Sequence, residues 1–211
     1  MKNFKRFTIL IFLLFIYILI SASAYTNAVC SDISDSVFRL HVIANSNSSE
    51  DQNLKYIVRD NVLEYMNSIT SGVTSKEKII EIVSNHLEEF KQIAQNTVYE
   101  NGFDYEVSIE IGNFEFPTKT YGDVSFPAGL YDALKIKIGN ANGQNWWCVM
   151  FPPLCFIDVS SGIVPEDSKE VLESELSEEE YSLVTGAGSE SKIKFKIVEV
   201  LQNFKISGIF M

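Results

Sequence analysis

The stretch from Ser125 to Asp158 constrains the fold most, because it holds two apolar segments separated by a short polar loop. In residues 134–138 (L-K-I-K-I) apolar and basic side chains alternate, as expected for a strand with one solvent-facing side. Residues 146–151 (W-W-C-V-M-F) are apolar throughout, which is typical of a strand buried on both faces. The loop between them, residues 139–144, is rich in Gly and Asn, which favour turns. We therefore predict an antiparallel hairpin in the core, ended by Pro152-Pro153, which cannot donate hydrogen bonds to a ladder.

The N-terminus has the pattern of an export signal. Residues 1–6 carry three basic side chains, residues 7–20 are apolar apart from one threonine, and S-A-S-A follows. This is a secretory signal peptide with cleavage predicted after Ala24. The alternative is an uncleaved membrane anchor, because the apolar run approaches the ~20 residues of a membrane span when it is extended to Ala24. The expected organisation is a signal peptide over residues 1–24 and a single exported domain over residues 25–211.

Length and charge limit the class of the exported part. Removal of residues 1–24 leaves 187 of the 211 residues, which is enough for one compact domain. The removed segment holds three of the 17 basic residues and no acidic residue, so the net charge changes from −11 to −14. Such an acidic balance argues against nucleic acid as a partner and against adsorption to anionic lipid, so that membrane contact is expected only through an uncleaved N-terminus.

Apolar periodicity predicts strands and helices in separate parts of the chain. Alternation at period two predicts strands, a period near 3.6 predicts helices, and Gly or Asn marks the ends of several segments. The predicted strands are residues 37–44, 105–111, 121–126, 131–138 and 146–151, and the predicted helices are residues 52–67, 76–99, 165–180 and 193–204, with a linker at 160–162. The fold class is therefore α+β, an antiparallel sheet with segregated helices.

The cysteines and histidines give little support for catalysis or metal binding. Cys148 and Cys155 flank a segment that doubles back at two prolines, so they form either a short disulfide or two buried thiols. Cys30 is left over, in what we expect to be a frayed terminus. Only His41 and His86 are present, with none of the Cys or His spacings of a zinc site, so no metal and no cofactor is predicted. A Cys–His pair of Cys148 or Cys155 with His41 would be needed for an exported hydrolase.

Polar and aromatic residues suggest where a partner could bind. Arg39 and His41 share one face of the first strand, and Asn45 follows it. The functional interpretation is a recognition face. The structural alternative is that Arg39 pairs with an acidic residue of the adjacent helix while Asn45 caps that helix. Trp146 and Trp147 are neighbours and must point to opposite faces of a strand, so that one is expected in the core and the other as an interface anchor.

Two long motifs resemble the stage II sporulation protein R family. The first, residues 38–63, reads F-R-L-H-V-I-A-N-S-N-S-S-E-D-Q-N-L-K-Y-I-V-R-D-N-V-L, and the second, residues 126–156, contains F-P-A-G-L-Y-D-A-L-K-I-K-I-G and N-W-W-C-V-M-F-P-P-L-C-F. The residues that match the motifs are Arg39, His41, Ala44, Asn45, Ser46, Asp51, Gln52, Arg59 and Asp60 in the first and Trp146, Trp147, Cys148, Pro152, Pro153 and Cys155 in the second.

The resemblance implies a signal and not an enzyme. Such a protein is made in the forespore, is exported into the space between two membranes, and activates a membrane-embedded aspartic protease that cleaves the precursor of sigma factor E. On this expectation Arg39, His41, Asn45, Trp146 and Trp147 are the candidate contact residues, and the chain has no catalytic residue. Two other functions stay open, an exported cell-wall or peptide hydrolase using Cys148 or His41, and a structural protein of the septal space.

Overall fold

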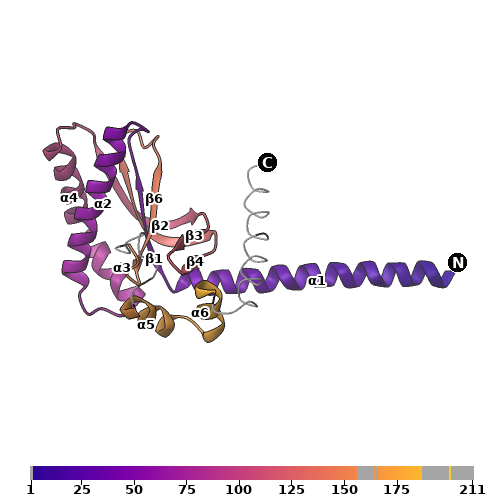
Figure 1. The fold of residues 1–211 in the computed structure, drawn as a ribbon. Coiled ribbons are helices and arrows are strands. Elements are labelled where there is room, and N and C mark those ends of the chain that lie inside the picture. Colours follow the sequence, from indigo (N-terminus) through magenta and orange to yellow (C-terminus); the bar gives the residue numbers. More distant parts are fainter. Residues whose placement is uncertain (1, 156–163, 165, 187–199, 201–211) are drawn as a thin grey trace.

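The computed structural model describes residues 2–155, 164, 166–186 and 200. It confirms the α+β class, with helices packed on a mixed sheet (Figure 1). The elements in chain order are α1 (Lys2–Asp35), β1 (Phe38–Ile43), α2 (Ser49–Thr70), α3 (Lys76–Asn85), α4 (Leu87–Glu100), β2 (Val107–Phe116), β3 (Lys119–Tyr121), β4 (Val124–Phe126), β5 (Gly129–Ile138), β6 (Asn145–Phe151), α5 (Glu166–Glu175) and α6 (Glu178–Thr185).

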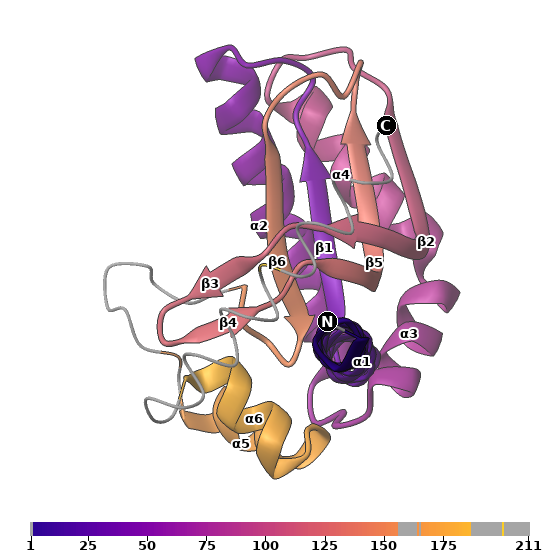
Figure 2. The same cartoon turned by 90° about the vertical axis from the view of Figure 1, so that its right-hand side faces the viewer.

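The sheet differs from the predicted hairpin in its strand order, β2-β5-β1-β6. The prediction that β5 and β6 pair with each other is wrong, because β1 lies between them (Figure 2). β1 is parallel to β5 and antiparallel to β6, while β2 and β5 are antiparallel. The sheet is therefore mixed and not wholly antiparallel. Neighbouring strands lie about 5 Å apart, so the loop at residues 139–144 has to span the width of one strand, about 10 Å, a distance that six residues cover easily.

Backbone N–H groups of that loop donate hydrogen bonds to residues that follow β1 and hold the loop across the end of the strand. Asn140 N–H donates to Asn45 Oδ1 at 2.9 Å, and Gly143 N–H donates to the carbonyl of Ala44 at 2.9 Å. A Cβ at Gly143 would collide with the backbone carbonyl of Ser46, so only glycine fits this close approach. We call residues 44–47 and 139–144 the latch. It fixes β1 as the central strand.

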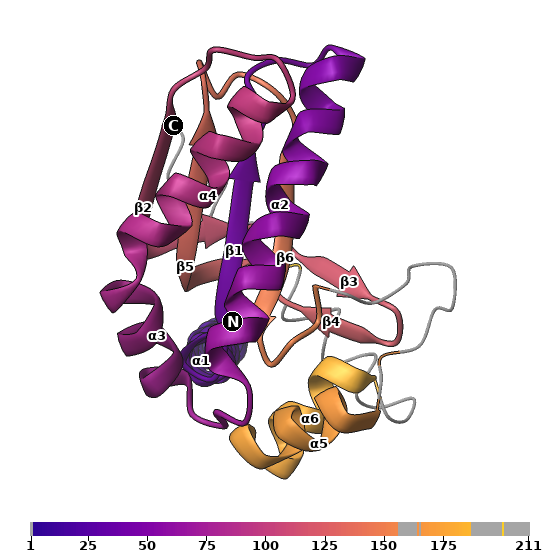
Figure 3. The same cartoon turned by 90° about the vertical axis from the view of Figure 1, so that its left-hand side faces the viewer.

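Helices cover one face of the sheet. Leu40 and Val42 of β1, together with the apolar side chains of β5, pack beneath α2, α3 and α4 and form the larger apolar core. Figure 3 shows α2 and α4 lying in front of the strands on this side. The alternation predicted for the first strand is confirmed, since Arg39 and His41 lie on the other face, opposite Leu40 and Val42.

On the other face, the described residues outside the sheet cover the lower half. There the β3–β4 hairpin, the end of α1, α5 and α6 enclose a second apolar cluster that includes Phe116, Phe126, Tyr131 and Leu183. The upper half is not covered by the part of the chain that the structure describes (Figure 2). Lys137 Nζ lies 2.9 Å from Glu110 Oε1 on this exposed surface. We call the surface formed by Ser108, Glu110, Lys135 and Lys137 the open face.

The predicted boundary after Ala24 falls inside one continuous helix. α1 runs without a break from Lys2 to Asp35, and its last three turns pack into the domain, with Ile33 fully buried. Cys30 is 8 % exposed, so its predicted position in a frayed terminus is wrong. The sequence reading failed here because the apolar residues after Ala24 were not recognised as a face that docks on β5 and α6.

Several predicted segments are subdivided in the structure. The helix expected over residues 76–99 breaks at His86, where φ is −108° and ψ is 19°, and becomes α3 and α4. Within the predicted helix at 165–180, residues 166–175 form α5 and residues 178–180 begin α6, with a capping box at Ser177 between them. Residues 121–126 form not a single strand but most of the β3–β4 hairpin, which turns at Gly122 with a φ of +58°. The predicted linker at 160–162 lies outside the described residues, as does all of the predicted helix at 193–204 except Val200.

Candidate functional site

Arg39 is buried beneath the β3–β4 hairpin and is fully inaccessible to solvent. Its Nη2 donates to the hydroxyl of Tyr121 at 2.8 Å, and its guanidinium carbon lies 4.1 Å from the ring centre of Phe116 and 4.7 Å from that of Tyr131. In the described part of the chain no carboxylate pairs with it, so the predicted ion pair with the adjacent helix is not found. Aromatic faces and oxygen acceptors compensate its charge instead, and Arg39 is part of the core beneath the hairpin.

His41 lies two residues along the same face and stacks on Trp147. The two ring centres are 3.6 Å apart, and His41 Nε2 lies 2.7 Å from Asn145 Oδ1, which accepts its hydrogen bond. Burial lowers the pKa of His41 to about 4, and the positive charges of Lys135, Lys137 and Arg39 contribute to this lowering. The imidazole is therefore neutral at neutral pH. It serves as a flat packing partner for the indole.

Trp146 and Trp147 point to opposite faces of β6, as predicted. The expectation that one lies in the core and the other is exposed is wrong, because both are half-buried. Trp146 lies on the helical side, where the guanidinium carbon of Arg59 is 4.2 Å from its ring centre. The ring of Tyr56 meets it edge-on at 5.6 Å, and Tyr56 is itself 38 % exposed. The indole N–H of Trp146 has no hydrogen-bond partner among the described residues. We call Tyr56, Arg59 and Trp146 the aromatic–cationic patch.

Sequence reasoning did not single out Tyr56 and named Arg59 only as a motif match. Both side chains belong to α2 and are three positions apart, so they share a helix face outside its apolar stripe. That spacing was the signal in the sequence. Their position over Trp146 was not predictable, because it depends on β6 lying beside β1.

Asn45 is part of the latch and does not cap α2. Ser48 is the N-cap, and its hydroxyl accepts a hydrogen bond from Asp51 N–H at 3.1 Å. Asn45 Nδ2 donates to Asp51 Oδ2 at 2.8 Å, which ties the start of the helix to the latch. Buried Lys55 reaches the same loop and donates to the carbonyl of Gln144 at 3.2 Å. Much of the first motif therefore builds the connection between β1 and the loop that crosses it.

Cys148 and Cys155 are joined by a disulfide, with Cα atoms 5.3 Å apart. Cys148 packs on the helical side with Leu40, whereas His41 lies on the opposite face. The two residues therefore do not form the Cys–His pair that a hydrolase would need, and a disulfide sulfur is not available as a thiolate nucleophile.

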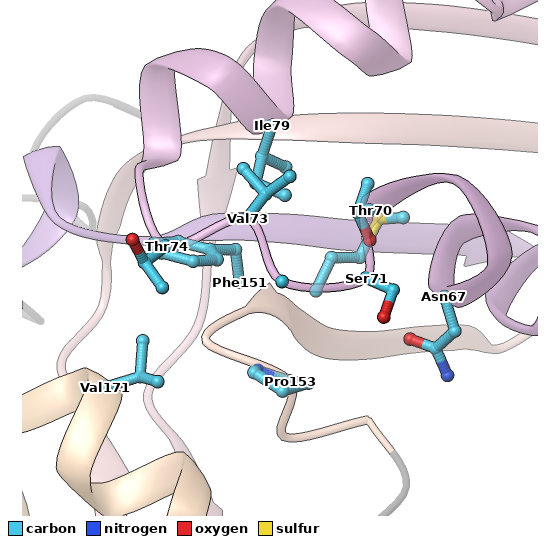
Figure 4. Close-up of a pocket in the computed structure, with 11 residues that line it drawn as sticks. Asn67, Thr70, Ser71, Val73, Thr74, Ile79, Phe151, Pro153 and Val171 are labelled. Atoms are coloured by element: carbon cyan, nitrogen blue, oxygen red, sulfur yellow. The ribbon is translucent and has the colours of Figure 1, made fainter.

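A cavity of about 350 Å³ lies below the end of β6, between the α2–α3 loop and α5 (Figure 4). Val73, Ile79 and Phe151 form its apolar wall, and Asn67 and Thr70 supply polar groups from α2. The described residues that line it include no ionisable side chain. The described residues also contain no cluster of three or more His, Cys, Asp or Glu that could hold a metal ion.

Comparisons with known proteins identify the family. The family described as stage II sporulation protein R (spore_II_R) matches residues 34–161. This chain belongs to the stage II sporulation protein R family. It is 42 % identical over 130 residues to the stage II sporulation protein R of Bacillus subtilis (strain 168), an alignment that covers 62 % of this chain and 58 % of that protein. The chain thus matches somewhat over half the length of this relative, and no solved structure matches it.

The matched region of this stage II sporulation protein R family member contains β1 to β6, and with them the latch, the open face and the aromatic–cationic patch. It begins at the last residues of α1, so the apolar half of that helix lies outside it. Among the described residues α1 is long and apolar enough to cross a membrane. The chain is therefore a sporulation protein whose N-terminal helix is consistent with a signal peptide or a membrane anchor.

Proposed function

We propose that this protein is an exported sporulation signal that activates a membrane-embedded aspartic protease by direct contact, so that the protease cleaves the precursor of sigma factor E. The observation that carries the proposal is membership of the stage II sporulation protein R family. The apolar N-terminal helix supports export from the forespore into the space between the two membranes. In this role the protein contributes a surface and no catalytic group.

The candidate contact residues have different accessibility, which decides how they should be tested. Arg39 is fully buried and Asn45 holds the latch, so their substitution would alter the fold before it altered a contact. His41 is also buried, under Trp147. Trp146 and Trp147 are half-exposed and lie on opposite sides of the sheet edge. We therefore assign direct contact to the tryptophan-bearing edge and a supporting role to Arg39, His41 and Asn45.

The test is reconstitution in a host that does not sporulate. The full chain is co-expressed with the protease and with an epitope-tagged sigma precursor, and precursor cleavage is followed by immunoblot. Cleavage that requires this chain, and that is lost when residues 2–24 are deleted to prevent export, is the expected result. If the exported chain accumulates beside a competent protease and the precursor stays intact, the proposed activation is wrong.

A further inference from the structure

α1 joins a segment that is long and apolar enough to cross a membrane directly to the core of the domain. Its apolar side chains from Phe4 to Ile20 are largely exposed, whereas Val29 and Ile33 are 7 % and 0 % exposed. The residues from Phe4 to Ala24 would span about 30 Å as a helix, which is the thickness of a bilayer's hydrocarbon core. Docking then begins within one or two turns, so a retained α1 would hold the domain at the level of the lipid headgroups.

Hydrogen bonds fix the angle at which α1 leaves the domain. The hydroxyl of Tyr25 donates to Glu179 Oε1 on α6 at 2.7 Å, directly after the apolar half. At the other end of the docked part, Ser36 Oγ donates to the carbonyl of Glu175 at 3.0 Å. Lys76 Nζ donates to the backbone carbonyl of Ser34 at 3.2 Å. α1 is therefore attached over its last three turns and is not a free tether.

This attachment determines which side of the sheet faces the membrane. α1 projects from the side that carries the β3–β4 hairpin and the open face, and α2 and α4 lie on the far side (Figure 1). Viewed along α1, the strands lie behind the helix end with α2 and α4 behind them (Figure 2). A retained α1 would therefore turn the open face toward the membrane that α1 crosses. The side covered by α2 and α4 would then face away from that membrane.

The aromatic–cationic patch lies on this outward side, where Tyr56 and Arg59 of α2 meet Trp146 of β6. Trp, Tyr and Arg are the residues enriched at interaction hot spots. The Trp146 ring holds the guanidinium of Arg59 in place, and Arg59 Nη2 contacts the carboxylate of its exposed neighbour Asp60 at 2.6 Å. A carboxylate of a partner can exchange with that neighbouring acid, while an apolar side chain covers the exposed ring of Tyr56.

We propose that α1 is retained as a membrane anchor and that it turns the open face toward the membrane it crosses. The aromatic–cationic patch then lies on the outward side. There it binds a protein partner through a segment that has an acidic residue beside an apolar one. The inference rests on the proposed function for the identity of the partner. It deepens that function by assigning the contact to one side of the domain and by keeping the N-terminal segment attached.

Matched variants separate the two sides of the domain. In the reconstituted system we expect Tyr56→Ala with Arg59→Ala to reduce precursor cleavage and co-purification with the protease at least tenfold. Ser108→Ala with Lys137→Ala, on the open face, should leave both within twofold of wild type. Thermal unfolding of each detergent-solubilised full-length variant verifies that it is folded. The single Arg59→Lys variant keeps the charge but not the planar group, so its cleavage and co-purification should lie between those of the wild type and those of the double patch variant.

The outcomes distinguish this inference from the function on which it rests. If the wild-type chain neither binds the protease nor promotes cleavage, the proposed function is wrong, and the protease is then not the partner of the patch. If the wild-type chain is active and the patch variants retain full activity while folded, or only the open-face variants lose it, the assignment of the contact side is overturned. Mass spectrometry of the active chain decides retention, since a species beginning at Tyr25 would refute the anchor.

The orientation can be measured without the partner. In full-length protein reconstituted in nanodiscs, a fluorophore is attached to a cysteine introduced at Thr120 of β3 or at Glu64 of α2, both of which are exposed. Lipids carrying a headgroup quencher should quench the Thr120 label at least threefold more strongly. Equal quenching at the two positions, or stronger quenching at Glu64, would overturn the proposed orientation.

Discussion

Mild acid is expected to destabilise the domain through His41. Burial lowers the pKa of this imidazole to about 4 in the folded state, whereas an unfolded chain titrates near 6.5. As the pH falls, the unfolded state therefore binds a proton first. The stability contributed by the neutral, buried ring is fully present above about pH 6.5 and is lost as the pH approaches 4.

The size of the effect follows from those two pKa values. Between about pH 7.5 and about pH 5.5 the linkage relation gives a loss of about 1.3 kcal/mol for a single group with this shift. His41 is only 5 % exposed, so solvent screening reduces this value little. The value already includes the repulsion between the protonated imidazole and the positive charges of Arg39, Lys135 and Lys137, which are among the causes of the lowered pKa.

The assay compares urea unfolding of the full-length protein in detergent micelles with that of His41→Gln at both pH values. Carboxylates titrate in both proteins, so the difference between them isolates the imidazole. We expect the wild type to lose about 1 kcal/mol more than His41→Gln on acidification. Parallel losses within about 0.3 kcal/mol would show that His41 is not held neutral by the core, and would refute the burial argument.

Three further substitutions test the other structural elements. Replacing Cys148 and Cys155 together with alanine removes a short covalent loop and should lower the free energy of unfolding by about 2.5 kcal/mol in urea titrations. Gly143→Ala places a Cβ against the backbone carbonyl of Ser46 and should cost at least about 2 kcal/mol by the same measurement. Ile33→Ala leaves a cavity where α1 docks and should cost about 2–4 kcal/mol, read as a lower thermal midpoint in detergent.

Control substitutions accompany the last two. At Gly72, which has a φ of +78° but open space around it, alanine should cost only about 1 kcal/mol from backbone strain. Ile18→Ala lies on the exposed apolar half of α1 and should leave the thermal midpoint of the domain within about 1 °C. Equal losses at Gly143 and Gly72, or at Ile33 and Ile18, would contradict the latch and the docked helix respectively.

Local patterns predicted the elements well and their pairing poorly. The alternation in residues 37–44 placed Arg39 and His41 on one strand face, and the 3.6-residue period located α2. The β5–β6 hairpin was mispredicted because a strand, a Gly/Asn loop and a second strand look the same in sequence whether or not a third strand lies between them. The contacts of the latch hold β1 between β5 and β6, and they join residues almost one hundred positions apart in the sequence.

The candidate site was predictable as residue types and not as surfaces. Trp146 and Trp147 were correctly assigned to opposite faces. The burial of Arg39 was missed, because its aromatic surroundings come from β2, β5 and the hairpin, and no local pattern connects these to β1. Cys30 was misplaced for the opposite reason, since a strong local pattern, the apolar export signal, concealed the packing of the residues that follow it.

The central position of β1 has a consequence for the export proposed above, in which the residues that follow the N-terminal signal segment cross the membrane before the rest of the domain. β1 is the first strand to arrive, yet both of its neighbours come from the last strands of the sheet, with Arg39 opposite Ala133 on one side and Val149 on the other. No earlier segment can complete the sheet around it. Translocation must therefore deliver the chain at least as far as Phe151 before the domain can close, and until then β1 has two unpaired edges that a chaperone or a second copy of the chain could occupy.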